Sequence, residues 1–274
     1  MMDAPSPVLP ERIAVATLGF DGFGDEAFEP AFSGLPDTGF RSVEFNCWYA
    51  RTITPQGLAS IRDRSAAICV TPVSLHVPSF SPGPEPSDLA RETARWCWLI
   101  EAATIVGVTL LKCTGRDRGE AGGVESIIAL LREVAPVAAE RGVRISLENH
   151  ANNVLEFAED YDRIFDAIDD PGVGMCLDTG HFAASGVDML AIVDRFGSRI
   201  NHVDLKDCAG PGREFVPFGD GVVDFDEVLD AVNATGYSGY LVVEFPRRGD
   251  DTALTDLAAG AAIARRHVDE VDRA

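Results

Sequence analysis

The feature that most constrains the fold is a regular alternation of short apolar runs with longer amphipathic segments. Eight runs have the length and composition of strands, namely RIAVATL (12–18), SVEFN (42–46), VTPVSLHV (70–77), VTLLKC (108–113), VRISLENH (143–150), VGMCLD (173–178), INHVDLKD (200–207) and YLVVEF (240–245). Helical segments follow these runs, at about 25–35, 55–68, 87–106, 122–141, 156–168, 187–196, 224–235 and 252–270. Strands that alternate with helices in this way predict parallel strand–helix–strand units.

Eight such units predict a (β/α)8 TIM barrel, which fits a chain of 274 residues. We expect one domain over 12–274, preceded by a loose proline-containing tail over 1–11. A doubly wound open sheet is the alternative architecture. It usually has fewer strands, and no GxGxxG motif follows the first apolar run here.

Two long loops follow predicted strands and therefore lie at the carboxyl face of the barrel, where barrel enzymes carry their sites. One is the proline-rich stretch SFSPGPEPSD (79–88), and the other is CAGPGREFVPFGDG (208–221). The glycines of 208–221 suit a segment that closes over a pocket, although a rigid connector has the same composition.

Composition excludes several classes of protein. The formal net charge of −21 argues against a nucleic-acid partner, because a polyanion would be repelled. The sequence contains neither an apolar run of about 18 residues nor a secretory signal pattern, so we expect a cytoplasmic protein without a membrane partner. Six cysteines without a CxxC pair indicate buried thiols in a reducing compartment.

Ionisable residues gather where the predicted strands end. They are Glu44, His76, Glu148, His150, Asp178, His202, Asp204, Lys206 and Glu244. Residues two apart in a strand point the same way, so several of these side chains face the barrel interior together. Buried carboxylates that converge are unfavourable as bare charges, and a divalent cation held by carboxylates and imidazole resolves the repulsion.

Several of these residues also have a purely structural explanation. Asp178 could cap the following helix, and His76 and His202 could be hydrogen-bonded core histidines. His181 could simply begin a helix, Lys206 could be solvated at its strand end, and Glu44 could be a supporting edge group.

Five stretches resemble the xylose-isomerase-like barrel superfamily, which includes sugar isomerases and epimerases, inosose and dehydroshikimate dehydratases, and endonuclease IV-type enzymes. They are ISLENH (145–150), CLDTGHF (176–182), NHVDLKD (201–207), GDGVVDF (219–225) and LVVEF (241–245), within a resemblance that covers roughly 12–268. The order Glu, Asp-x-x-His, His, Glu on successive strands carries the resemblance.

The resemblance implies one divalent metal ion held by Glu148, Asp178, His202 and Glu244, with Mn²⁺ favoured and Mg²⁺, Co²⁺ or Zn²⁺ as alternatives. It also implies that Glu148 and Glu244 are the acid–base residues. The expected substrate contacts are His181, His76, Lys206, His150 and Arg213.

Three functions remain open. The first is a sugar isomerase or epimerase that works through a metal-stabilised enediolate, and the second is a dehydratase of the inosose or 3-dehydroshikimate type. The third is a non-catalytic metal-binding barrel. Val154 replaces the acid that ketose 3-epimerases tend to carry six residues after the first metal glutamate, with Glu156 two positions further on. The expected partner is a small sugar, keto-sugar or cyclitol, and a homo-oligomer is left open.

Overall fold

The computed structural model describes residues 8–21, 27–212, 214–246 and 253–268. Most of the expected N-terminal tail, as well as Arg213, lies outside the described residues, so the tail stays a prediction.

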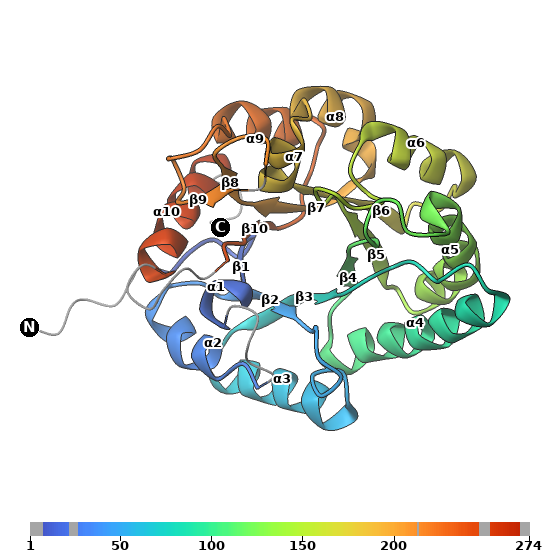
Figure 1. The fold of residues 1–274 in the computed structure, drawn as a ribbon. Coiled ribbons are helices and arrows are strands. Elements are labelled where there is room, and N and C mark those ends of the chain that lie inside the picture. Colours follow the sequence, from blue (N-terminus) through green and yellow to red (C-terminus); the bar gives the residue numbers. More distant parts are fainter. Residues whose placement is uncertain (1–7, 22–26, 213, 247–252, 269–274) are drawn as a thin grey trace, which may run out of the picture.

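Eight parallel strands close into a barrel, which confirms the predicted (β/α)8 architecture (Figure 1). The strands are β1 (Ile13–Ala16), β2 (Ser42–Asn46), β3 (Thr71–Val77), β4 (Leu110–Cys113), β5 (Arg144–Glu148), β6 (Val173–Asp178), β7 (Ile200–Leu205) and β10 (Leu241–Val243). Each pairs with its neighbours in chain order, and β10 pairs with β1 to complete the ring.

The expected helices surround the barrel close to their predicted ranges. They are α2 (Glu29–Gly34), α3 (Pro55–Ala67), α4 (Pro86–Val106), α5 (Gly123–Glu140), α6 (Ala158–Ala167), α8 (Met189–Phe196), α9 (Phe225–Ala234) and α10 (Ala253–His267). Several further short elements were not expected from the sequence. They are α1 (Leu18–Asp21), η1 (Leu35–Asp37), α7 (Thr179–Ser185), η2 (Gly197–Arg199) and the antiparallel pair β8 (Asp207–Cys208) and β9 (Phe215–Val216).

The sequence specifies helix boundaries through capping residues. Thr54 accepts a hydrogen bond from the Gly57 backbone N–H at the start of α3, and Pro55 occupies the first turn. Gly107 follows the C-terminal end of α4 and has a φ of 92°. A side chain would strain this left-handed conformation, so glycine is needed there.

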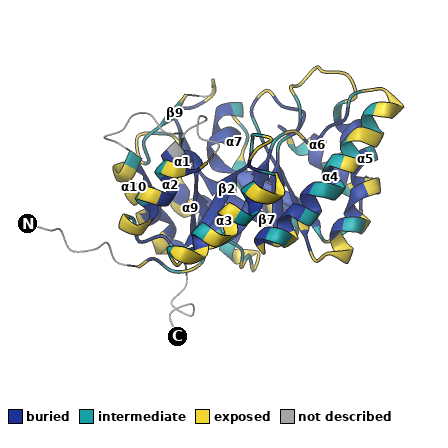
Figure 2. Ribbon diagram, turned by 90° about the horizontal axis from the view of Figure 1, so that it is seen from below, coloured by how far each residue is buried: buried dark blue, intermediate teal, exposed yellow. Residues whose placement is uncertain are grey.

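The main apolar core lies between the outside of the barrel and the helices, and exposed residues lie on the outer faces of those helices (Figure 2). A smaller apolar cluster includes Ala14, Ala16 and Val242 from adjacent strands of the barrel. Among the described residues, we find no helix with both the length and the apolar character needed to span a bilayer.

Candidate active site

Five carboxylates converge inside the barrel, and we call them the carboxylate cluster. They are Glu44, Glu148, Asp178, Asp204 and Glu244, and each side chain is at most 3% exposed. Four come from the strands β2, β5, β6 and β7, and Glu244 directly follows β10. Such a concentration of buried acids needs cations to balance it.

Lys112 of β4 supplies one of these cations and was not among the expected site residues. Its Nζ lies 2.5 Å from Asp204 Oδ2, 2.6 Å from Glu244 Oε2 and 2.6 Å from Glu44 Oε1. The side chain is fully buried. The ammonium group therefore donates hydrogen bonds to Asp204 and Glu244, and it forms an ion pair with Glu44, whose Oε1 has no hydrogen-bond geometry to a described donor.

Lys206, an expected residue just after β7, supplies the second cation. Its Nζ donates to Asp178 Oδ2 and to Glu244 Oε1, each at 2.8 Å. Thr179 at the start of α7 exchanges hydrogen bonds with the Lys206 backbone. Asp178 Oδ1 meanwhile accepts the His181 backbone N–H, so this carboxylate caps α7 and pairs with Lys206 at once.

His202 lies deeper, against Glu44. Its Nε2 is 2.9 Å from Glu44 Oε2 and 3.4 Å from Asp204 Oδ1, and Ser74 Oγ also donates to Glu44 Oε2. Among the described residues, His202 shares a compact group of ligand atoms with Glu44 and Asp204, not with the other three expected ligands. As a ligand His202 therefore stays a prediction, and the geometry favours Asp204 in its place.

The donor set suits a hard divalent cation. Glu148, Asp178, Asp204 and Glu244 each offer an oxygen, and these oxygens lie within 4.8 Å of one another. Glu148 Oε2 and Asp204 Oδ1 are buried without hydrogen-bond geometry to any described donor, although His76 Nε2 lies 3.2 Å from the former. Unused buried carboxylate oxygens of this kind fit metal ligation.

The two expected acid–base residues have pKa values shifted in opposite directions. Burial raises the pKa of Glu148 well above its usual range, and although Lys112 opposes the rise, Glu244 and Asp204 reinforce it. Burial also disfavours ionised Glu244, but Lys112 and Lys206 outweigh it and hold the pKa of Glu244 well below its usual range. One carboxyl group is thus set to hold a proton and the other to accept one.

The pKa values of Lys112, His202 and Asp178 also depend on the competition between burial and neighbouring charges. Burial opposes the charged form of Lys112, but Asp204 and Glu244 outweigh burial and raise its pKa well above the usual range. Burial likewise opposes charge on His202, but its contacts with Asp204 and Glu44 raise its pKa to about 9. For Asp178, burial outweighs Lys206 and raises the pKa to about 6.

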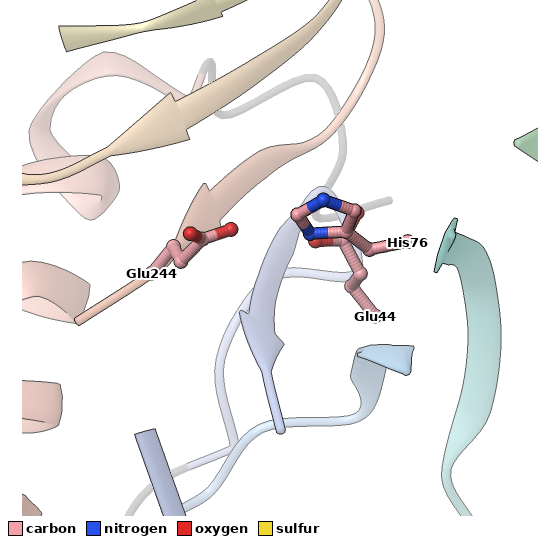
Figure 3. Close-up of side chains that lie close together, drawn as sticks. All are labelled: Glu44, His76 and Glu244. Carbon is pink, nitrogen blue, oxygen red and sulfur yellow. The ribbon is translucent and has the colours of Figure 1, made fainter. Parts of the chain in front are cut away.

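A cavity of about 210 Å³ opens onto the cluster at the carboxyl ends of the strands. Ionisable side chains form part of its lining, namely His76, Glu148, His150, His181, Lys206 and Glu244. Trp48 and Phe215 add apolar walls. Figure 3 shows Glu244 facing His76 and Glu44. Pockets for drug-sized ligands measure about 300–1,000 Å³, so this volume suits a smaller molecule.

Two expected residues, His150 and His181, stack with ring centroids 3.8 Å apart. The Ala151 backbone N–H donates to His181 Nδ1, which places the proton of the neutral ring on Nε2. His150 Nδ1 lies 3.0 Å from the Ala151 carbonyl oxygen, which requires a proton on that nitrogen. His181 also belongs to a compact group of possible ligand atoms with Glu148 and Asp178.

His76 is the remaining expected histidine of the pocket. The Asn46 amide donates to its Nδ1 at 3.2 Å, and burial together with Lys112 lowers its pKa well below the usual range. A neutral ring with its proton on Nε2 therefore faces Glu148.

The loop 208–221 forms a hairpin on the β8–β9 pair. The Asp207 carboxylate joins the two ends of this loop. It accepts hydrogen bonds from the backbone N–H groups of Cys208, Gly219, Gly221 and Val223. Phe215 of β9 reaches the cavity, where its ring meets His181 edge-on with centroids 5.0 Å apart. The expected substrate contact Arg213 lies on this loop but outside the described residues.

The sequence alone could have indicated that Lys112 belongs to the site. The chain has two lysines against 21 arginines, and Lys112 interrupts an apolar run just as Glu148 does. A charge in the middle of a buried strand calls for an opposite charge nearby.

Comparison with known proteins places these residues in a family. The family model described as "Xylose isomerase-like TIM barrel" matches residues 34–269. An inosose dehydratase of Geobacillus thermodenitrificans is 33% identical over 157 residues, which are 51% of this chain and 52% of that protein. The chain thus spans about half the length of the curated relatives it matches.

Solved structures show the same fold at lower identity. D-psicose 3-epimerase of Clostridium cellulolyticum H10 has a TM-score of 0.76 at 20% identity, over 93% of this chain and 98% of that one. The IOLI protein with a bound zinc atom has a TM-score of 0.75 at 18% identity, over 93% and 97%.

Proposed function

Because the chain belongs to the xylose isomerase-like TIM barrel family, we propose that it removes the proton next to the carbonyl of a small keto-sugar or keto-cyclitol. The observation that carries the proposal is the pair Glu148 and Glu244, which line one cavity and have pKa values shifted apart. The lowered pKa of Glu244 and the raised pKa of Glu148 lead us to assign Glu244 as the base and Glu148 as the group that returns a proton.

A divalent ion belongs to this proposal. Glu148, Asp178, Asp204 and Glu244 would hold it, and a bound divalent ion supplies Lewis-acid polarisation of the substrate carbonyl. The zinc atom of the IOLI protein supports a divalent ion in this fold. The choice among Mn²⁺, Mg²⁺, Co²⁺ and Zn²⁺ stays a prediction, because carboxylate oxygens suit all of them.

The remaining polar groups of the cavity position and stabilise the substrate. The ammonium of Lys206, 2.8 Å from Glu244 Oε1, lies where negative charge develops on the substrate oxygen once the proton leaves. His181 offers Nε2–H as a proton donor, and Trp48 and Phe215 exclude water on the apolar sides.

Among the possible products, we favour dehydration. The base takes the proton beside the carbonyl, and the hydroxyl group on the next carbon accepts a hydrogen bond from His181 Nε2–H. This hydroxyl leaves as water with the proton that Glu148 supplies, and a carbon–carbon double bond remains. The histidine donor at the cavity and the inosose dehydratase relatives support this choice.

Epimerisation is the second candidate, and the two opposed carboxyl groups favour it. After Glu244 removes the proton, Glu148 can deliver one to the other face of the same carbon. No leaving group is then required, and the epimerase structures share this fold.

A solvent-exchange experiment tests the proposal and separates its products. Keto-inositols and keto-hexoses are incubated with the protein and Mn²⁺ in D₂O, and NMR follows deuterium beside the carbonyl while absorbance follows an enone. Enone formation supports dehydration, and exchange with inversion supports epimerisation. Absence of both with every substrate contradicts the proposal and favours a non-catalytic metal-binding barrel.

Replacing Glu244 with Gln tests the role of the base. Gln keeps one oxygen donor but cannot accept the proton, so turnover should fall by at least about 10²-fold. Metal content by atomic emission should decline less than turnover does. Turnover close to that of the unmodified protein would exclude Glu244 as the base.

A further inference from the structure

The chain has only two lysines, and both have their Nζ atoms in the carboxylate cluster. Every other basic side chain outside the histidines is an arginine. An ammonium group is a compact point charge that several carboxylates can approach from different directions, whereas a guanidinium group spreads its charge over a plane with a fixed fork of donors. The two positions that retain lysine are thus positions where the shape of the cation matters.

The two lysines differ in their freedom to move. Lys206 lines the cavity, so its ammonium group can swing toward the substrate. Lys112 is 0% exposed and is absent from the cavity lining, so its ammonium group stays among the carboxylates. Of the two lysines, Lys112 is the one that contacts Glu44. Glu44 lies outside the four-carboxylate group that would hold a divalent ion.

Lys112 already pairs with two of the carboxylates that a metal ion would need. Its Nζ is 2.5 Å from Asp204 Oδ2 and 2.6 Å from Glu244 Oε2, and both residues belong to the four-carboxylate group. A small divalent ion lies about 2.0–2.2 Å from such oxygens. An ion that binds Asp204 and Glu244 would lie close to an ammonium group held by the same two carboxylates, and two cations at roughly 5 Å repel each other.

We propose that Lys112 is the resident cation of the carboxylate cluster, and that a divalent ion binds only when its ammonium group leaves Asp204 and Glu244 and stays paired with Glu44 alone. This inference rests on the proposed metal site. Metal binding is then an exchange of cations, in which the ion must displace a charge already present. The metal-free protein keeps its charge balance through Lys112, and metal affinity is lower than four carboxylates alone would give.

Metal affinity of a Lys112→Met variant tests the exchange. EDTA-treated protein is titrated with Mn²⁺ and with Zn²⁺ by calorimetry. We expect the dissociation constant of Lys112→Met to be at least tenfold lower than that of the unmodified protein. Arg62→Met removes the same charge at an exposed position far from the barrel centre and serves as the matched control, with a change below twofold. Equal or weaker binding by Lys112→Met would overturn the inference.

Thermal unfolding guards against a variant that folds poorly. Without metal, Lys112→Met should melt below the unmodified protein, and Mn²⁺ should raise its Tm more than it raises that of the unmodified protein. A variant that folds only with metal also supports the exchange, because the ion then replaces the lost cation. A variant that is destabilised equally with and without metal contradicts it.

Lysine NMR tests the inference in the unmodified protein. Labelling with [ε-¹³C]lysine gives two signals, and Lys206→Met leaves one and so assigns them. Saturating Zn²⁺ should shift the Lys112 signal, and an unchanged Lys112 signal with zinc bound would overturn the exchange. The deuterium-incorporation and enone assays test the proposed reaction separately, because they measure the chemistry on the substrate and not metal affinity.

Discussion

At the scale of single residues, strand register decides which side chains meet. His202 and Asp204 both point into the barrel from β7, but they stand at different levels. Asp204 pairs in register with Asp178, whereas His202 pairs with Cys176. His202 therefore groups with Glu44, whereas Asp204 also groups with Glu148, Asp178 and Glu244. The sequence pattern predicts a ligand from β7 and cannot choose between these levels.

Paired substitutions distinguish the two candidates. Asp204→Asn should raise the dissociation constant for Mn²⁺ by at least about tenfold, because a charged ligand is lost. His202→Gln should change it by less than about threefold, because His202 contacts Glu44 and lies outside the four-carboxylate group. Calorimetric titration of both variants after EDTA treatment gives the comparison. The opposite order of effects would make His202 the ligand, as the family pattern implies.

At the scale of elements, long periodic segments were predictable and short polar ones were not. The eight barrel strands and the longer helices follow from hydrophobic period, with ends at residues such as Gly107 and Thr54. Helix α7 and the β8–β9 hairpin are too short for a period to show. Their positions depend on side-chain contacts, such as the bond from the His181 backbone N–H to Asp178 and those that Asp207 accepts.

The same limit applies to the site. Its acidic members were predictable because charges that end apolar runs require partners. Their pairing with Lys112 depends on the closure of the barrel, which brings β4 opposite β7 and β10, elements far apart in the sequence. No local pattern encodes those contacts.

Helix α7 positions Lys206 through a glycine. A Cβ atom at Gly180 would lie 2.7 Å from Lys206 Cγ and 2.8 Å from its Cβ, closer than packed atoms allow. Gly180→Ala should therefore displace the lysine stem, lowering kcat by about tenfold and destabilising the fold by about 1–3 kcal/mol. Steady-state kinetics and urea unfolding measure the two effects. A variant with unchanged kcat would show that Lys206 does not need this placement.

At the scale of the whole molecule, the barrel interior concentrates buried carboxylates whose charge is offset in part by buried cations. The cluster places five carboxylates against Lys112, Lys206 and the imidazole of His202. Because these groups come from six different strands or strand ends, their balance depends on the closed barrel and disappears when the chain unfolds. Stability of the metal-free protein should therefore depend on pH through the groups whose pKa values differ between the folded and unfolded states.

His202 sets the expected behaviour on the alkaline side. Its pKa is about 9 in the folded protein, against 6.5 for an ordinary histidine, so the folded state binds the extra proton more tightly. The resulting stabilisation is complete below pH 6.5 and is lost as the pH rises through 9, a change on the order of 3 kcal/mol. Asp178, with a pKa of about 6 in the folded protein against 3.8 for an ordinary aspartate, titrates below this window.

Urea unfolding of EDTA-treated protein between pH 6.5 and 9.5 measures the loss of stability, and His202→Gln should show a much shallower decline. Equal slopes for the two proteins would mean that His202 is neutral in the folded barrel and that Glu44 relies on Lys112 alone for its charge balance.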